Sequence, residues 1–176
     1  MNKTRVGKLA LSGVFTALAL VLLLLTSTPI ATVGTAALAA VCGIPVVAEA
    51  GRRAGWIHFA AVTALAWLLA PAAEGNGMYT VFLGWYTVFK AWLEQKHLPR
   101  PAEWGIKYGA LAVAMAVGVA GSVFLLQIPL PAWDWVIPAA VLLLCAIFAV
   151  YDRCLTGLVG MYLTRLQPSL RKIFKM

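Results

Sequence analysis

The sequence predicts an all-α fold, a polytopic membrane bundle of six transmembrane helices with both termini in the cytoplasm. The composition is the first reason: the 176 residues are 62% hydrophobic and only 11% charged, which leaves too little polar surface to cover a water-soluble core. The second reason is that the chain divides into six apolar segments, each within a few residues of the length of about 20 that spans a bilayer.

The six expected spans follow one another closely and form a single membrane domain over residues 1–176. Their approximate bounds are 9–25, 30–48, 56–72, 78–93, 105–128 and 135–151, followed by a basic amphipathic tail over 152–176. The first segment has a basic start like a secretory signal, but no small-residue cleavage site follows it. A five-span or partly re-entrant arrangement stays open, because Gly43-Ile44-Pro45 interrupts the second segment and Lys90 lies in the short fourth one.

The distribution of cationic residues predicts the orientation. The connections expected inside, 49–55 and 94–104, contain Lys and Arg, and so does the tail. The connections expected outside contain neither, and their only charged residues are Glu74 and Asp134. Because cytoplasmic loops of membrane proteins are enriched in Lys and Arg, the pattern predicts a multi-pass protein with both ends inside.

The last expected span is followed by residues that keep a helical pattern. Apolar side chains recur there at helical spacing, at Leu155, Leu158, Tyr162 and Leu166. We therefore expect the helix to continue past the membrane interface as an amphipathic helix, with Arg153 and Arg165 toward lipid headgroups or a partner.

Several classes of function are disfavoured by the residues present. The net charge of +8 is spread over loop ends and not gathered in one stripe, so we expect no nucleic-acid partner. The cysteines, Cys42, Cys145 and Cys154, are odd in number and lie in or beside apolar segments, where they act as small packing residues. His58 and His97 have no second ligand at helical spacing and are interpreted as interfacial residues. We expect no enzyme activity, no cofactor and no metal site.

The fourth expected span is the most distinctive stretch of the chain. At 100° per residue its aromatic side chains form one stripe, made of Tyr79, Phe82, Tyr86 and Phe89. Two interpretations stay open: a packing seam between helices, or a surface whose outer half stacks on a flat ligand.

Charged residues gather at the inner ends of the expected spans. A lysine at the bilayer centre costs about 2.5 to 3.5 kcal/mol on insertion scales, so Lys90 needs a partner, and Glu94 lies one turn further on. The other charged residues at inner span ends are Glu49, Glu103, Lys107, Asp152 and Arg153. A ring of ion pairs is therefore expected, with a structural role or a role in coupling to a cytoplasmic partner.

Small residues at four-residue spacing mark helix faces that another helix can approach closely. They are Gly13 and Ala17 in the first span, Ala36 and Ala40 in the second, and Ala112, Ala116 and Ala120 in the fifth. The pattern predicts tight helix packing without saying which face meets an external partner.

The chain resembles the substrate-binding S component of energy-coupling factor transporters, which take up vitamins and other micronutrients. The resemblance covers the full length in size and topology. Three stretches carry its local part, namely Lys8-Leu9-Ala10-Leu11-Ser12-Gly13-Val14-Phe15-Thr16-Ala17-Leu18, Gly84-Trp85-Tyr86-x-x-x-Lys90 and Tyr151-Asp152-Arg153. They look like uncharacterised S-component-like proteins of Gram-positive bacteria.

The resemblance implies a bacterial plasma-membrane protein that binds a small ligand from the outer side and docks on a transmembrane scaffold subunit with its ATPase subunits. It implies that Gly13 and Ala17 form the docking pair, although the Ala-x-x-x-Ala common in that family is absent from the first span. The ligand-side candidates that it implies are Glu74, Asn76, Tyr79, Trp133 and Asp134. Two outer acids and no outer cations favour a neutral or cationic ligand.

Two other functions stay open. The first is a non-catalytic membrane scaffold protein of cell-envelope or cell-shape assembly, for which six short-looped spans and a basic tail serve equally well. The second is an autonomous small transporter or membrane enzyme, which would need more polar residues at the midplane than Thr63, Thr87 and Lys90. For any of these, membrane lipid is an expected partner.

Overall fold

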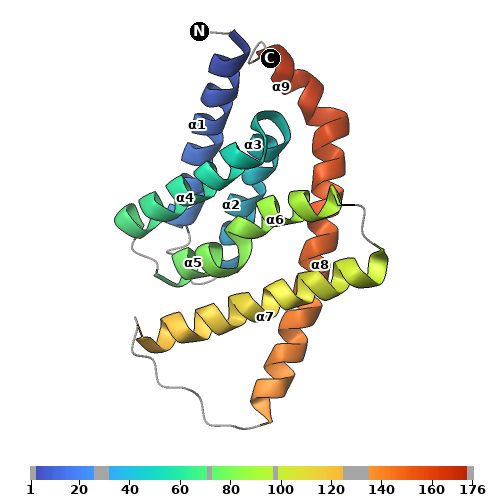
Figure 1. The fold of residues 1–176 in the computed structure, drawn as a ribbon. Helices are drawn as coiled ribbons and strands as arrows, with labels where there is room; N and C mark the ends of the chain where they lie inside the picture. The colour runs from blue at the N-terminus through green and yellow to red at the C-terminus, as the bar shows by residue number, and fades with distance from the viewer. Residues whose placement is uncertain (1–2, 26–31, 71–72, 97–98, 125–134, 174–176) are drawn as a thin grey trace.

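A computed structural model describes residues 3–25, 32–70, 73–96, 99–124 and 135–173, and every regular element in these ranges is helical (Figure 1). The first half of the chain contains α1 (Lys3–Leu24), α2 (Thr32–Val41), α3 (Gly43–Ala50) and α4 (Arg52–Leu69). The second half contains α5 (Ala73–Met78), the π-helical turn η2 (Tyr79–Leu83), α6 (Gly84–Glu94), α7 (Arg100–Phe124), α8 (Val136–Met161), the π-helical turn η3 (Tyr162–Leu166) and α9 (Gln167–Ile173).

Four helical segments of the described residues are long and apolar enough to cross a membrane. They are Val6–Leu24, Thr32–Ala50, Arg100–Gly121 and Ile137–Leu170, which match the expected first, second, fifth and sixth spans. The expected third and fourth spans are also helical, as α4 and as α5–η2–α6, but they are not among the four. The all-helical fold is confirmed, and the count of six spans stays a prediction.

The connections between helices are shorter than the sequence predicted. Gly51 alone separates α3 from α4, with a φ of 87° that favours glycine, so most of the expected loop 49–55 is helical. The expected loops 73–77 and 94–104 are partly wrong as well, because α5 begins at Ala73 and α7 at Arg100. Polar residues are common in the first turn of a helix, and here Glu74 and Glu103 occupy that turn.

The core of the molecule lies among α1 to α4, α5 and η2. Its centre consists of small and branched side chains with little or no exposed surface, including Ala19, Leu23, Ala36, Ala40, Val62 and Ala66. Close packing of alanines at four-residue spacing, as at Ala36 and Ala40, lets α2 approach α1.

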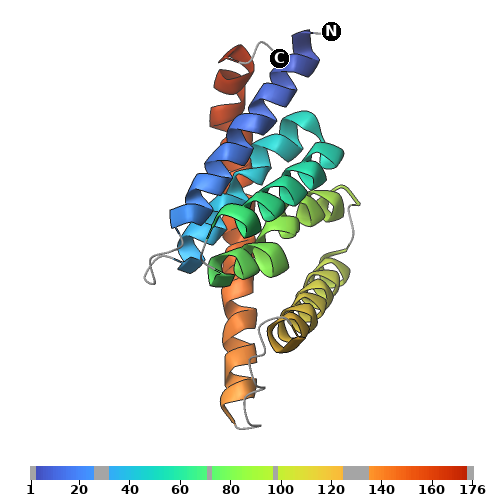
Figure 2. The ribbon, with the colours of Figure 1, turned by 90° about the vertical axis from the view of Figure 1, so that its left-hand side faces the viewer.

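The helices α7 and α8 lie at the edge of this core. In each of the candidate spans Arg100–Gly121 and Ile137–Leu170, 17% of the residues in the most apolar window are buried, against 50% in Thr32–Ala50. Figure 2 shows α7 standing apart from the bundle of the first four helices. The apolar residues that these two helices bury, Leu111, Phe148 and Leu155, form a small second cluster with Ile44 and Tyr86.

The turn η2 divides the expected aromatic stripe. A π-helical turn holds an extra residue, so side chains on either side of it no longer keep 100° spacing. Tyr79 packs on Phe59 of α4, with ring centroids 6.1 Å apart, whereas Tyr86 packs on Phe148 of α8 at 5.0 Å. Tyr79 and Tyr86 therefore belong to two different clusters of the core, and Phe82 packs against both of them.

The tail continues α8 as expected, through η3 into α9. Leu155 and Tyr162 are buried, but Leu166 is 48% exposed and Leu170 takes its place against the core. The extra residue in η3 explains this shift of the buried face.

The molecule has two chemically different ends, which Figures 1 and 2 show toward the top and the bottom. The start of α1, the Gly51 turn and α9 lie toward the top, and the end of α6 and the start of α7 lie near mid-height. We call the top the basic end, because the elements there contain Lys8, Arg52, Arg53 and Arg165. The junction of α4 and α5, the end of α7 and the start of α8 lie toward the opposite end, which contains Glu74.

Candidate functional site

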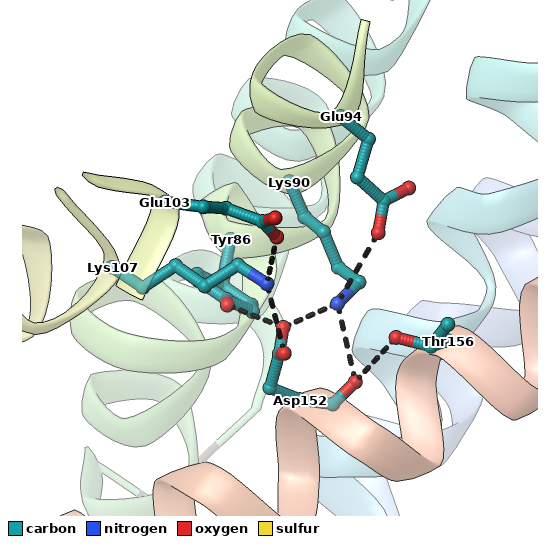
Figure 3. A network of polar contacts seen from close by, with 7 residues as sticks. All are labelled: Tyr86, Lys90, Glu94, Glu103, Lys107, Asp152 and Thr156. Atoms are coloured by element: carbon teal, nitrogen blue, oxygen red, sulfur yellow. Dashed lines mark hydrogen bonds and ion pairs between the residues drawn. The ribbon is translucent and has the colours of Figure 1, made fainter. Parts of the chain in front are cut away.

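A buried carboxylate joins α6, α7 and α8 near the basic end. Asp152 of α8 lies between Lys90 of α6 and Lys107 of α7, and its side chain faces both ammonium groups (Figure 3). Tyr86, one turn before Lys90 on α6, donates its hydroxyl to Asp152 Oδ1 at 2.7 Å. Three consecutive helices thus meet at one side chain.

The geometry around Asp152 satisfies both carboxylate oxygens. Lys90 Nζ donates to Oδ1, and Lys107 Nζ donates to Oδ2 at 2.9 Å. The backbone carbonyl of Asp152 accepts two further hydrogen bonds, from Lys90 Nζ at 3.2 Å and from Thr156 Oγ1 at 2.9 Å. We call Asp152 and the residues around it the Asp152 joint, namely Tyr86, Lys90, Glu94, Glu103, Lys107 and Thr156 (Figure 3).

Each lysine of the joint also has a carboxylate on its own helix. Lys90 Nζ lies 3.4 Å from Glu94 Oε1, and Lys107 Nζ lies 2.6 Å from Glu103 Oε1. The joint therefore combines two ammonium groups with three carboxylates. Lys90, Lys107 and Asp152 are 2%, 3% and 4% exposed, so these charges are buried but fully paired. Buried charges are tolerated in proteins when they are paired in this way.

The Asp152 joint is a structural connection, although Lys90 and Glu94 also line a cavity of about 450 Å³ between α3, α6 and α8. The Lys90 ammonium group already meets Asp152 Oδ1, the Asp152 carbonyl and Glu94, which is as many acceptors as it has donors. Because α7 and α8 bury few apolar residues, these polar contacts are well suited to hold them on α6. In a medium of low dielectric constant such contacts are strong.

The expected ring of ion pairs is confirmed in part. Lys90 with Glu94, and Lys107 with Glu103, pair as helical spacing predicts. Glu49 instead accepts a hydrogen bond from Gln167 Nε2 at 2.7 Å, and Arg153 is exposed. The convergence of both lysines on Asp152 was not predicted. The signal available in the sequence was the one carboxylate that directly follows the last expected span, since ionisable groups at membrane depth tend to pair with each other.

A cavity lies at the opposite end of the molecule, where α7 and α8 face α4, α5 and η2. Its volume is about 740 Å³. The walls are mainly apolar and include Trp67, Phe82, Met115, Val117, Gly118 and Leu144. Glu74 is the one ionisable residue among the described residues that line it.

The residues expected at the ligand side have different placements. Glu74 lines this cavity, whereas Asn76 and Tyr79 are each 1% exposed and are not part of its lining. Asn76 Nδ2 donates to the carbonyls of Ala66 at 3.1 Å and Ala70 at 3.0 Å, which terminates α4. Trp133 and Asp134 lie outside the described residues.

The expected docking pair lies on the outer surface of α1. Gly13 and Ala17 are exposed, and a Cβ atom added at Gly13 would meet nothing within 4 Å. Val14 and Leu18 on the same surface are 55% and 46% exposed. The inner side of α1 faces the core through Thr16, so the small residues face away from the rest of the chain.

His58 is not an interfacial residue as expected, because it is buried between α1 and α4 with 4% of its surface exposed. Its Nδ1 lies 2.8 Å from Thr16 Oγ1, which itself donates to the carbonyl of Ser12 at 2.8 Å. The interpretation failed because the rotation of α4 places His58 toward α1, and that rotation cannot be taken from the position of a residue along a span.

Comparison of this chain with protein-family models, with curated proteins and with solved structures finds no match.

Proposed function

We propose that this chain is the substrate-binding subunit of an ATP-driven micronutrient uptake transporter of the energy-coupling factor type, in the bacterial plasma membrane. The observation that supports this function best is the contrast between the two ends of α7 and α8. These two helices contact α6 at the Asp152 joint, and the cavity of about 740 Å³ lies between them and α4, α5 and η2 at the other end. A cavity between helices that are held together at one end suits a subunit that binds a small molecule.

The proposed topology has six spans with the basic end in the cytoplasm. The six helical segments, α1, α2–α3, α4, α5–η2–α6, α7 and α8, run alternately away from and toward the basic end (Figure 1). Cationic residues are enriched on the cytoplasmic side of membrane proteins. In this orientation the cavity beside Glu74 opens toward the outside, where a nutrient is collected.

The ligand that fits this cavity is small, largely apolar, and neutral or cationic. Trp67, Phe82 and Met115 offer aromatic and flexible apolar surface, and Glu74 offers one carboxylate to an amine or a hydroxyl group. An anionic ligand would face that carboxylate with no cation among the described lining residues.

The energy for uptake would come from partner subunits. The chain carries no Gly-rich phosphate-binding loop of its own, so an ATPase must be a separate protein. The exposed Gly13 and Ala17 on α1 offer a surface that a helix of a membrane scaffold subunit can approach closely.

The test for the partners is co-purification of the tagged full chain from native membranes in mild detergent, with the recovered proteins identified by mass spectrometry. We expect a membrane scaffold and its ATPases with the native chain, and their loss with Gly13→Leu/Ala17→Leu. The matched control is Ala112→Leu/Ala116→Leu, which changes an equally exposed pair of small residues on α7. Loss of the partners with both variants would argue against docking through α1.

The test for the cavity is a substitution that fills it. Gly118 lines the cavity, whereas Gly109 on the same helix is exposed and open. We expect Gly118→Leu to abolish release of a co-purified small molecule on denaturation, and Gly109→Leu to leave it unchanged. Equal amounts of that molecule from both variants would exclude this cavity as the ligand site.

The alternative function is a non-catalytic scaffold of cell-envelope or cell-shape assembly. The observation that favours it is that Asn76 and Tyr79 are used within the fold, Asn76 at the end of α4 and Tyr79 in the core. Recovery of envelope-synthesis proteins in place of ATPases, together with no released small molecule, would support this alternative.

A further inference from the structure

A second cavity, at the basic end, has the chemistry of an anion site with apolar walls. It lies between α4 and α6 and has a volume of about 460 Å³. Its lining consists of Arg52, Arg53, Trp56, Val88, Phe89 and Trp92. Two adjacent arginines therefore share one hollow with three aromatic rings.

The positive charge at this cavity has no partner within the described part of the chain. Arg52 and Arg53 are exposed and form no ion pair there, and no acidic residue occupies the first turn of α4. Lys96 adds a third cation, with its ammonium group 4.4 Å from the centre of the Trp92 ring. Glu94, the nearest acid along α6, pairs with Lys90 of the Asp152 joint. A concentration of cations without nearby acids attracts an anion.

The apolar part of the cavity is well defined. Val88 is 2% exposed and forms the floor of the cavity. Gly55 lets α4 lie close to α6 at this point, since a Cβ atom added at Gly55 would lie 3.0 Å from Val88 Cγ2. The ring of Trp56 packs against Phe59 at 6.0 Å, and that of Trp92 against Phe89 at 5.8 Å. These contacts hold both indoles beside the arginines before any ligand binds.

We infer that this cavity binds the phosphodiester headgroup of an anionic glycerophospholipid from the cytoplasmic leaflet. Arginine matches phosphate oxygens with two parallel hydrogen bonds, and basic pockets between helices on the cytoplasmic side suit such headgroups. Tryptophan is enriched at the level of lipid headgroups. The apolar floor and indole rings suit the glycerol and the upper acyl chain, which a free phosphate ion lacks. The inference requires the membrane orientation proposed above but not the transport function.

The experiment is a titration of the purified full chain in a neutral detergent with phosphatidylglycerol, or with phosphatidylcholine of the same acyl chains, followed by native mass spectrometry. We expect the native chain to bind phosphatidylglycerol more tightly. Because each basic residue near an anionic lipid surface contributes about 1 kcal/mol, Arg52→Gln/Arg53→Gln should weaken that binding about thirtyfold. Equal affinity of the native chain for the two lipids would overturn the inference.

Two controls separate this site from general attraction. Lys8→Gln/Arg100→Gln removes the same charge from exposed positions on α1 and α7 that do not line the cavity, and should leave binding within about twofold of the native chain. An equal loss in both double variants would overturn the site. Arg52→Lys/Arg53→Lys keeps the charge but loses the two parallel hydrogen bonds of arginine, so its affinity should lie between those of the native chain and Arg52→Gln/Arg53→Gln. That partial recovery also shows that the loss is not due to misfolding, and an affinity as low as that of the Gln variant counts against the site. Displacement of the lipid by equimolar inorganic phosphate would show a free-anion site and overturn the lipid assignment.

Discussion

Replacing Asp152 with Asn is expected to weaken the attachment of α7 and α8 to the rest of the molecule. The amide keeps the shape of the carboxylate, and its oxygen can still accept the hydrogen bond from the Tyr86 hydroxyl. What is removed is the negative charge between two buried ammonium groups, those of Lys90 and Lys107. The variant therefore removes this charge, and it also turns an amide NH2 group toward an ammonium group in place of an acceptor oxygen.

The magnitude follows from what remains around each lysine. Removing one partner of a buried ion pair costs about 3 to 5 kcal/mol, because the other charge stays buried. In this chain Lys90 keeps Glu94 at 3.4 Å and Lys107 keeps Glu103 at 2.6 Å. The side chains of these glutamates are 41% and 27% exposed, so solvent screens them and they compensate only in part. We expect a loss near the lower bound, about 3 kcal/mol in the free energy of unfolding.

The assay is reversible unfolding of the purified full chain in mixed micelles with increasing sodium dodecyl sulfate, followed by circular dichroism. Arg153→Gln is the matched control, since it removes a charge from the exposed neighbouring residue and should cost less than about 0.5 kcal/mol. The double variant with Lys107→Met should cost less than the two single variants together by more than about 1 kcal/mol. If Asp152→Asn unfolds like the control, or if the two changes add without coupling, the joint does not hold these helices.

Three further substitutions test the fold. Gly84→Ala would place a Cβ atom 2.7 Å from the Tyr79 ring and should cost about 1 to 3 kcal/mol in the same unfolding assay, while Gly109→Ala, which meets nothing within 4 Å, should not destabilise. Gly51→Ala should cost about 1 to 2 kcal/mol, because φ at this turn is 87°; a neutral result would refute the need for glycine. Asn76→Ala removes two hydrogen bonds to the end of α4 and should cost about 1 to 3 kcal/mol, whereas no loss of stability would remove this structural role.

The helical segments could be predicted from the sequence because length and hydropathy are local properties. The expected spans all fall on helices, but the helix starts were placed too late in the chain. Arg52, Ala73 and Arg100 begin helices in segments that were interpreted as loops. Polar residues are compatible with the first turn of a helix as well as with a loop, so a hydropathy pattern cannot separate the two.

Contacts within one helix could also be predicted, but contacts between helices could not. Glu94 is one turn from Lys90, and that spacing alone predicts their ion pair. Asp152 lies 62 residues from Lys90, and the two meet only because α6 and α8 have particular rotations and cross at a particular point. The turn η2 changes the rotation of α6 relative to α5, which is also why the aromatic residues separated into two groups.

The order of the Asp152 joint along the chain has a consequence for how the protein is made. Lys90 and Lys107 leave the ribosome before Asp152, so on the proposed six-span topology α6 and α7 would enter the membrane without their central carboxylate. During that interval Glu94 and Glu103, each one turn from a lysine, are the only acids of the joint already synthesised. On that topology they would be the counterions of the two lysines until α8 arrives with Asp152. A chain that stopped before Asp152 would leave Lys90 and Lys107 with these two glutamates alone, where incompletely paired charges in a bilayer are costly.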